Sequence, residues 1–160
     1  MSTLKKNTAK AIGTSFGFGF LPLAPGTFGT IFGILVYYAL YFWQPELINW
    51  WLIGLSIVFT ALGTWSCKVL EKDWGHDPSR VVMDESVGVW ITMLFMPFNH
   101  WYVFFAFVLF RFFDILKPLG IRAIDGKMHS PFSVMLDDIV AGVYAWLVLQ
   151  GIIFFFGGYF

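Results

Sequence analysis

The stretch Asp137–Phe156, DDIVAGVYAWLVLQGIIFFF, places two acidic residues directly before the long uncharged segment Ile139–Phe156. A helix needs roughly 20 apolar residues to cross the hydrocarbon core of a bilayer, so this segment predicts a membrane span. A carboxylate at the edge of hydrocarbon is costly unless it is paired or binds a cation. The stretch therefore predicts a membrane helix with a metal site at its edge.

The composition of the whole chain agrees with a membrane protein. Of its 160 residues, 58% are hydrophobic and 12% are charged, and the mean hydropathy is +0.73. This polar fraction is too small to coat a soluble globule, so we expect one integral membrane domain. The formal net charge of zero gives no basic surface for following phosphates, which argues against a nucleic-acid partner. The single cysteine, Cys67, excludes an intrachain disulfide.

Apolar segments recur along the chain, and their lengths and breaks predict its fold. Pro97 and Asn99 favour a turn within the apolar region 87–116, which at about 30 residues, or about 45 Å of helix, is too long for one span. The sequence therefore predicts an all-α integral membrane protein, a compact bundle of about five short transmembrane helices. The predicted spans are Thr27–Trp43, Trp50–Leu70, Val87–Phe98, Trp101–Leu116 and Ile139–Phe156.

The positions of the charged residues favour five crossings over four. If the lysine-rich N-terminus stays in the cytoplasm, as basic segments tend to do, five crossings return residues 71–86 and 117–136 to the cytoplasmic side. Four crossings would leave Asp84 and Asp114 at opposite faces of the bilayer. Five crossings bring all the charged motifs together.

A segment rich in glycine and proline, SFGFGFLPLAPGTFGT (Ser15–Thr30), precedes the first predicted span. It cannot form a regular span, so it predicts a re-entrant or interfacial segment. Gly26 and Gly29 can let backbone N–H groups approach a phosphate, and the helix beginning near Thr27 would add its positive dipole end. Alternatively, the glycines permit close packing. No Walker lysine is present to favour the first interpretation, so both stay open.

Two pairs of adjacent acids each lie at the start of an apolar segment. Asp84 or Glu85 can cap one helix, and Asp137 or Asp138 can cap another. Adjacent side chains point about 100° apart on a helix, so one member of each pair should face the interior. The small residue Gly142 follows the second pair and permits another helix to approach closely. The pairs predict oxygen ligands for a hard cation.

The motif FRFFDILKP (Phe110–Pro118) spaces Arg111, Asp114 and Lys117 three residues apart near the end of a predicted helix. These side chains occupy one third of the helix circumference, and apolar residues cover the rest. One interpretation is an ion-pair network whose basic groups reach the interface. The other is a guanidinium and an ammonium that bind phosphate, with Asp114 orienting them or reaching a metal.

Four motifs follow one another along the chain: GFGFLPLAPGTFGT (Gly17–Thr30), VVMDESVGVWIT (Val81–Thr92), FRFFDILKP (Phe110–Pro118) and VMLDDIVAG (Val134–Gly142). With these motifs in this order, the chain resembles the phosphatidylglycerophosphatase A family over most of its length. The resemblance implies a multi-pass enzyme of the bacterial inner membrane, with one phosphatase domain over residues 1–160 and its site facing the cytoplasm. It further implies that the enzyme requires Mg²⁺ and converts phosphatidylglycerophosphate to phosphatidylglycerol.

The resemblance and the chemistry together predict a role for each charged group. Asp114 is expected to be the base that activates water or, alternatively, a phosphorylated nucleophile. Departures from the family pattern at Gly120, Ser130, Pro131 and Ser133 concern loop geometry. The other predicted site residues are Asp84, Glu85, Asp137 and Asp138 for catalysis and Mg²⁺ binding, and Arg111, Lys117, Gly26 and Thr27 for substrate binding.

A membrane carrier or channel that passes cations along buried carboxylates is the alternative function. The acids and bases gather at one predicted membrane face instead of being distributed across the bilayer, which favours the enzyme. The sequence predicts no particular oligomeric state.

Overall fold

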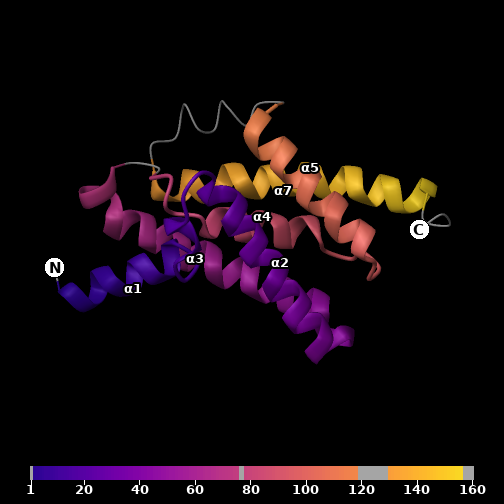
Figure 1. Ribbon diagram of the computed structural model, residues 1–160, viewed down its shortest axis with the longest axis horizontal. Helices are drawn as coiled ribbons and strands as arrows, with labels where there is room; N and C mark the ends of the chain where they lie inside the picture. The colour runs from indigo at the N-terminus through magenta and orange to yellow at the C-terminus, as the bar shows by residue number, and fades with distance from the viewer. Residues whose placement is uncertain (1, 76–77, 119–129, 157–160) are drawn as a thin grey trace.

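The computed structural model describes residues 2–75, 78–118 and 130–156, and all regular structure in these ranges is helical. The family departure at Gly120 lies outside the described residues. The helices, drawn in Figure 1, are α1 (Thr3–Gly13), the 3₁₀ helix η1 (Phe18–Phe20), α2 (Pro25–Trp43), the 3₁₀ helix η2 (Pro45–Leu47), α3 (Ile48–Trp74), α4 (Met83–Thr92), α5 (His100–Leu116) and α7 (Pro131–Phe156).

Three of the described segments are long and apolar enough to cross a membrane. They are α2 with 19 residues, Pro45–Trp74 with 30 residues and α7 with 26 residues. The second comprises η2 and α3. These three segments correspond to the predicted spans Thr27–Trp43, Trp50–Leu70 and Ile139–Phe156.

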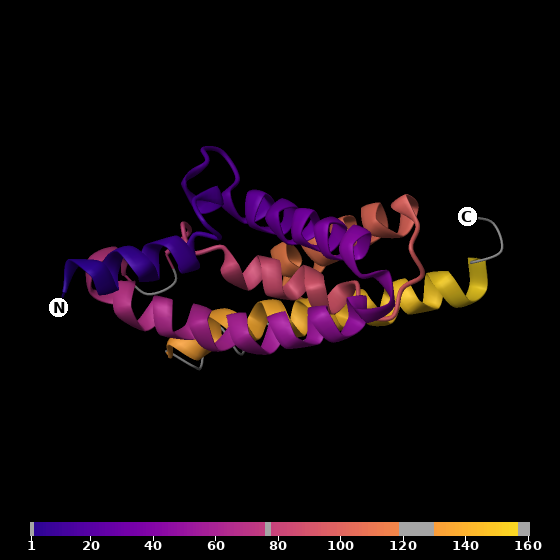
Figure 2. The ribbon, with the colours of Figure 1, turned by 90° about the horizontal axis from the view of Figure 1, so that it is seen from below.

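Helices α3, α4 and α7 run close to the long axis, and α2 and α5 cross it obliquely in Figure 1, so that successive helices of this set alternate in direction (Figures 1 and 2). The start of α2, the end of α3, the start of α4 and the start of α7 therefore lie toward one end of the molecule, and α5 also runs toward it. Helix α1 packs beside α3 at this end, where Lys6 Nζ lies 2.8 Å from Asp73 Oδ2. The motifs of acidic and basic residues are carried to the same end.

Helix α4 does not match the bounds of the span predicted for Val87–Phe98, because it begins four residues earlier and ends six residues earlier. Its 10 residues correspond to about 15 Å, half the thickness of the hydrocarbon core. Most of its residues are buried, and it contacts α2, α3, α5 and α7. The predicted break is present, because Asn99 Oδ1 accepts a hydrogen bond from Trp101 N and caps α5. The prediction was wrong in its bounds, since α4 ends at Thr92, before that break.

The glycine- and proline-rich segment is irregular only in its first part. Ser15 and Phe16 adopt left-handed backbone, and η1 and a bend follow before α2 begins at Pro25. Proline suits this first helical position because its missing N–H would have no partner there. The predicted helix start at Thr27 was thus two residues late. The remaining glycines of the segment belong to α2.

Two glycines of α2 allow α4 to pack closely against it. A Cβ on Gly29 would lie 2.5 Å from Val82 O, and one on Gly33 would lie 2.6 Å from Val89 Cγ1. Trp90 Nε1 donates a hydrogen bond to the Gly33 carbonyl at 2.9 Å. The close-packing interpretation therefore holds for Gly29.

On the opposite side of α4, its backbone meets the backbone of α7. A Cβ on Gly142 would lie 2.5 Å from Gly88 O, and one on Gly88 would lie 2.8 Å from Asp138 O. The Thr92 hydroxyl is within hydrogen-bonding distance of both glycine carbonyls, 3.0 Å from Gly88 O and 3.3 Å from Gly142 O. Small residues let the two helices approach, as the sequence around Gly142 predicts.

We expect Gly142→Ala to lower the free energy of unfolding by about 1 to 3 kcal/mol, because the added methyl group must displace the backbone of α4. Gly151→Ala is the matched control on the same helix, since nothing lies within 4 Å of a Cβ there. Unfolding of both variants in mild detergent, followed by circular dichroism, measures the difference. Equal stability of the two variants would contradict close packing at Gly88.

Candidate active site

The predicted motifs meet around one cavity of about 330 Å³. Of the nine predicted site residues, all except Thr27 line it; Thr27 lies beside Gly26 in the first turn of α2. The lining residues are Ala24, Pro25, Gly26, Ser79, Val81, Asp84, Glu85, Arg111, Asp114, Lys117, Val134, Asp137 and Asp138.

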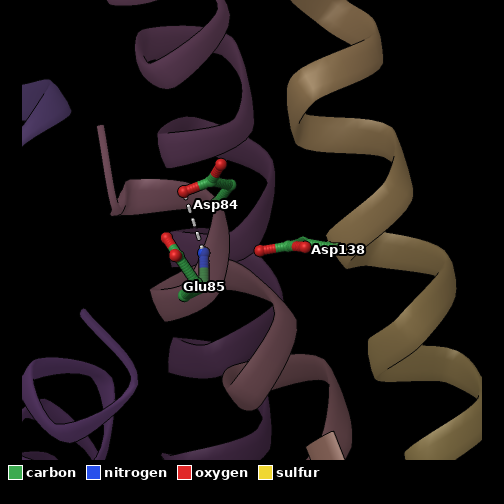
Figure 3. A group of neighbouring side chains, drawn as sticks. All are labelled: Asp84, Glu85 and Asp138. Carbon is green, nitrogen blue, oxygen red and sulfur yellow. Dashed lines mark hydrogen bonds between the residues drawn. The ribbon is translucent and has the colours of Figure 1, made fainter. Parts of the chain in front are cut away.

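Three carboxylates face one another on the wall between α4 and α7. Oxygen atoms of Asp84, Glu85 and Asp138 all lie within 4.8 Å of one another. Figure 3 shows Asp138 pointing from α7 toward the two acids on α4. Within the first turn of α4, Glu85 N donates a hydrogen bond to Asp84 Oδ1 at 3.1 Å, so the Asp84 carboxylate also binds the backbone of its own helix.

The glycine crossing explains why these acids meet. Asp84 lies four residues before Gly88 on α4, and Asp138 lies four residues before Gly142 on α7. Residues four apart occupy the same helix face one turn apart, so the acids stand next to the point where the backbones touch. Close helix approach therefore brings carboxylates from distant parts of the sequence together.

The acid pair on α7 lies inside the helix instead of at its start. Helix α7 begins at Pro131, six residues before Asp137, so neither acid caps it. Ser130 takes this role, because its Oγ accepts a hydrogen bond from Ser133 N, and the Ser133 hydroxyl donates in return to Ser130 O. Both acids line the cavity instead. The sequence predicts that at least one of them faces the interior.

The donor set on this wall fits a hard cation. Glu85 Oε2 is buried and has no hydrogen-bond partner within the described part of the chain. Asp84 and Asp138 are also buried, with 6% and 4% of their surface exposed. Buried carboxylates that face one another repel unless a proton or cation lies between them, and Mg²⁺ prefers such oxygen ligands.

Basic side chains occupy the other wall of the cavity. Arg111 Nη1 lies 2.6 Å from Asp114 Oδ2, and both side chains are mostly buried. Lys117 Nζ forms an ion pair with Asp137 Oδ2. Lys117 lies just after the end of α5 with left-handed backbone, so the predicted helical stripe ends one residue earlier than expected.

The ion pair with Lys117 distinguishes the two acids of α7. Asp138 joins the carboxylate cluster, whereas Asp137 faces a cation. Sequence reasoning treated the two acids alike, because the rotation of α7 toward its neighbours decides which one faces each wall.

Gly26 lies where the two walls approach each other. A Cβ at this position would collide with Glu85 Oε1 and would lie 3.1 Å from Arg111 Nη1. The glycine therefore leaves room for a carboxylate and a guanidinium over the first turn of α2.

Sequence reasoning missed several lining residues, of which Ser79 carries a polar side chain. Ser79 lies two residues before the motif that begins at Val81, but serine is common in turns and gave no separate signal. The apolar residues Ala24, Val81 and Val134 became identifiable only through the packing of the helices.

A helical, largely apolar chain with acidic and basic groups around one cavity fits the class of membrane-lipid phosphatases. Comparison with known proteins defines the family more closely. The sequence profile of the family "Phosphatidylglycerophosphatase A" matches residues 11–153. The chain belongs to the phosphatidylglycerophosphatase A family, which makes it a phosphatase and confirms the resemblance found in the sequence.

Similar proteins occur in several bacteria. A Bacteroides thetaiotaomicron protein named "Putative phosphatidylinositol-3-phosphatase" is 48% identical over 86% of this chain and 89% of its own length. Proteins named "Phosphatidylglycerophosphatase A" are 37% identical in Escherichia coli and 38% identical in Haemophilus influenzae. Each match covers 91% of this chain. It covers 81% of the Escherichia coli protein and 89% of the Haemophilus influenzae protein. No solved structure matches the chain.

We expect Gly26→Ala to lower kcat/KM for lipid phosphate release about tenfold or more, equivalent to about 1.4 kcal/mol, because the methyl group displaces Glu85 or Arg111. Gly54→Ala is the control, since a Cβ there meets nothing within 4 Å. Initial rates in mixed micelles at matched protein concentration compare the two. Parental kinetics for Gly26→Ala would mean that the cavity tolerates displacement of these side chains.

Proposed function

We propose that the chain hydrolyses the terminal phosphate monoester of phosphatidylglycerophosphate to phosphatidylglycerol and phosphate, using Mg²⁺. The observation that carries this proposal is the cluster of Asp84, Glu85 and Asp138 together with two basic side chains in one cavity. Family membership supports the reaction, and the oxygen-only donor set with its unpartnered Glu85 Oε2 supports the cation.

Each wall of the cavity has its own proposed task. The carboxylates of Asp84, Glu85 and Asp138 would hold Mg²⁺, which supplies Lewis-acid polarisation of the phosphoryl group when bound. Arg111 and Lys117 neutralise the remaining phosphoryl oxygens. Because both basic groups already face carboxylates, the cavity holds them near the phosphate position before the substrate enters.

Asp114 is the proposed base. It accepts a proton from water as the water oxygen attacks phosphorus and the bond between phosphorus and the glycerol oxygen breaks. The proton held by Asp114 then passes to the leaving glycerol oxygen, which restores the carboxylate. The ion pair with Arg111 fixes the carboxylate on the cavity wall. The alternative is direct attack by Asp114 on phosphorus, followed by hydrolysis of the phosphorylated residue.

Asp137 has two proposed roles. It is the fourth ligand predicted from the sequence, and its contact with Lys117 also supports a role in positioning that ammonium group. Substitution of the two neighbouring acids one at a time separates these roles.

Phosphatidylinositol 3-phosphate is the second candidate substrate. The relative that carries the corresponding name is 48% identical, above the 37% and 38% of the two phosphatidylglycerophosphatases. Both lipids present a phosphate monoester beyond a phosphodiester, so the same cavity chemistry serves either one.

The proposed location is the bacterial inner membrane, with five crossings and the site at the cytoplasmic face. Bacterial relatives support the source, and three apolar helices of sufficient length support the membrane. The alternating directions of α2, α3, α4, α5 and α7 support five segments whose charged ends share one side (Figure 1).

We expect purified protein to release phosphate from phosphatidylglycerophosphate with Mg²⁺ and to lose this activity in chelator. Asp138→Asn should lower kcat/KM at least about a hundredfold, because the amide keeps the shape of the side chain but removes an anionic ligand. Asp137→Asn, its neighbour, should lose less if it positions Lys117. Parallel assays with phosphatidylinositol 3-phosphate decide the substrate. Full activity in chelator would overturn the metal site.

For topology, we expect cysteines placed at Glu46 and Asn99 to react with an impermeant thiol reagent from the periplasmic side. A cysteine at Lys72 should react only after the membrane is opened, because it lies at the end of α3 nearest the site. Cys67 is buried and is replaced by alanine as background. Labelling of position 99 from the cytoplasm only would contradict five crossings.

A further inference from the structure

A second cavity adjoins the proposed catalytic cavity. It measures about 340 Å³ and is lined by Trp74, Pro78, Ser79 and Arg80. Ser79 also lines the catalytic cavity, so the two spaces meet at this residue. The reaction described above assigns no role to the second cavity.

Arg80 is the anion-binding group that this cavity offers. Its guanidinium carbon lies 6.0 Å from the centre of the Trp74 ring, and Lys10 Nζ lies 5.7 Å from the same ring. Arg80 makes no ion pair within the described residues, unlike Arg111 and Lys117 in the catalytic cavity. The aromatic ring holds the guanidinium in place without neutralising its charge.

The backbone around Arg80 is firmly anchored. Val81 N donates to Pro78 O, and Val82 N donates to Gly13 O, both at 2.8 Å. A Cβ on Gly19 would collide with the Arg80 carbonyl oxygen, so the loop before α2 packs directly against this residue. Three segments of the chain therefore fix the position of Arg80.

Apolar surface continues from the second cavity. Phe20 packs edge-on against Trp74, with ring centres 6.1 Å apart, and remains 54% exposed. Phe20 and Lys10 also line a third cavity together with Thr14, Phe16 and Gly17. Exposed aromatic surface therefore lies next to the second cavity, and Phe20 and Lys10 connect it with the third.

This arrangement matches the chemistry of a lipid that carries a diester beside its monoester. The basic groups of the catalytic cavity face carboxylates, whereas the diester oxygens of such a substrate need a cation of their own. We infer that Arg80, held over Trp74 and next to Ser79, binds the phosphodiester of the substrate while the monoester occupies the catalytic cavity. The planar guanidinium donates two parallel hydrogen bonds to phosphate oxygens. The inference rests on the proposed function, but it holds for either candidate lipid.

The test compares the parent with Arg80→Gln, Arg80→Lys and Lys5→Gln on phosphatidylglycerophosphate and on phosphatidylinositol 3-phosphate in mixed micelles. Arg80→Gln should raise KM about tenfold for the lipid that is hydrolysed and leave kcat within about twofold, because the diester lies away from the reacting phosphorus. Arg80→Lys should recover part of the loss. Lys5→Gln removes the same charge from an exposed site outside both cavities and should keep the parental KM.

The possible outcomes test the proposed phosphatase function and the diester site at Arg80 separately. A parent that hydrolyses neither lipid would overturn the proposed function itself. An active parent with an unchanged KM in Arg80→Gln would overturn the diester site alone, as would an equal rise in KM in Lys5→Gln, which would indicate general attraction of anionic lipid. A fall confined to kcat would assign Arg80 to the chemical step and also overturn the diester site.

Discussion

Direct contact between two helix backbones, at Gly88 of α4 and Gly142 of α7, is the constraint on which the site depends. Any side chain at either position would separate the helices, and the carboxylates one turn away would separate with them. The same contact lets Thr92 reach carbonyls of both helices. In hydrocarbon, where no hydrophobic force drives helices together, such close contact and shared hydrogen bonds hold a bundle together.

Helix α4 is short, but it can support the site because neighbouring helices enclose it. The glycines of α2 face one side of α4 and the glycine of α7 faces another, so a helix of 10 residues is buried from both directions. Ser86 lies within hydrogen-bonding distance of the Gly29 carbonyl and of Ser15 in the irregular loop. The carboxylates of α4 are thereby fixed from the loop, from α2 and from α7.

Much of this arrangement could be predicted from the sequence, because it follows from local pattern. Apolar segments gave the helical class, Pro97 and Asn99 gave the break before α5, and acids beside apolar runs gave most of the cavity wall. The early end of α4 at Thr92 could not be predicted, since apolar residues continue past it to Phe98. The backbone beyond the helix binds distant side chains, as Leu94 O accepts hydrogen bonds from Trp146 and Gln150 of α7. The pairing of Asp137 with Lys117 depends on the packing of α7 against the end of α5, which no spacing encodes. The position of Arg80 over Trp74, six residues earlier, depends on the path of the chain after α3, which the sequence pattern did not predict.

The charged side chains that line the cavity favour some ligands over others. Five carboxylates and two basic side chains line it, which leaves a formal charge of −3 (2 − 5) when all are ionised. Coulomb repulsion in a poorly hydrated space is strong, so such a cavity repels a phosphate dianion and attracts a divalent cation. Under the proposed function, the anionic headgroup would enter only after a cation has neutralised the carboxylates, and the affinity for lipid would depend on the concentration of that cation.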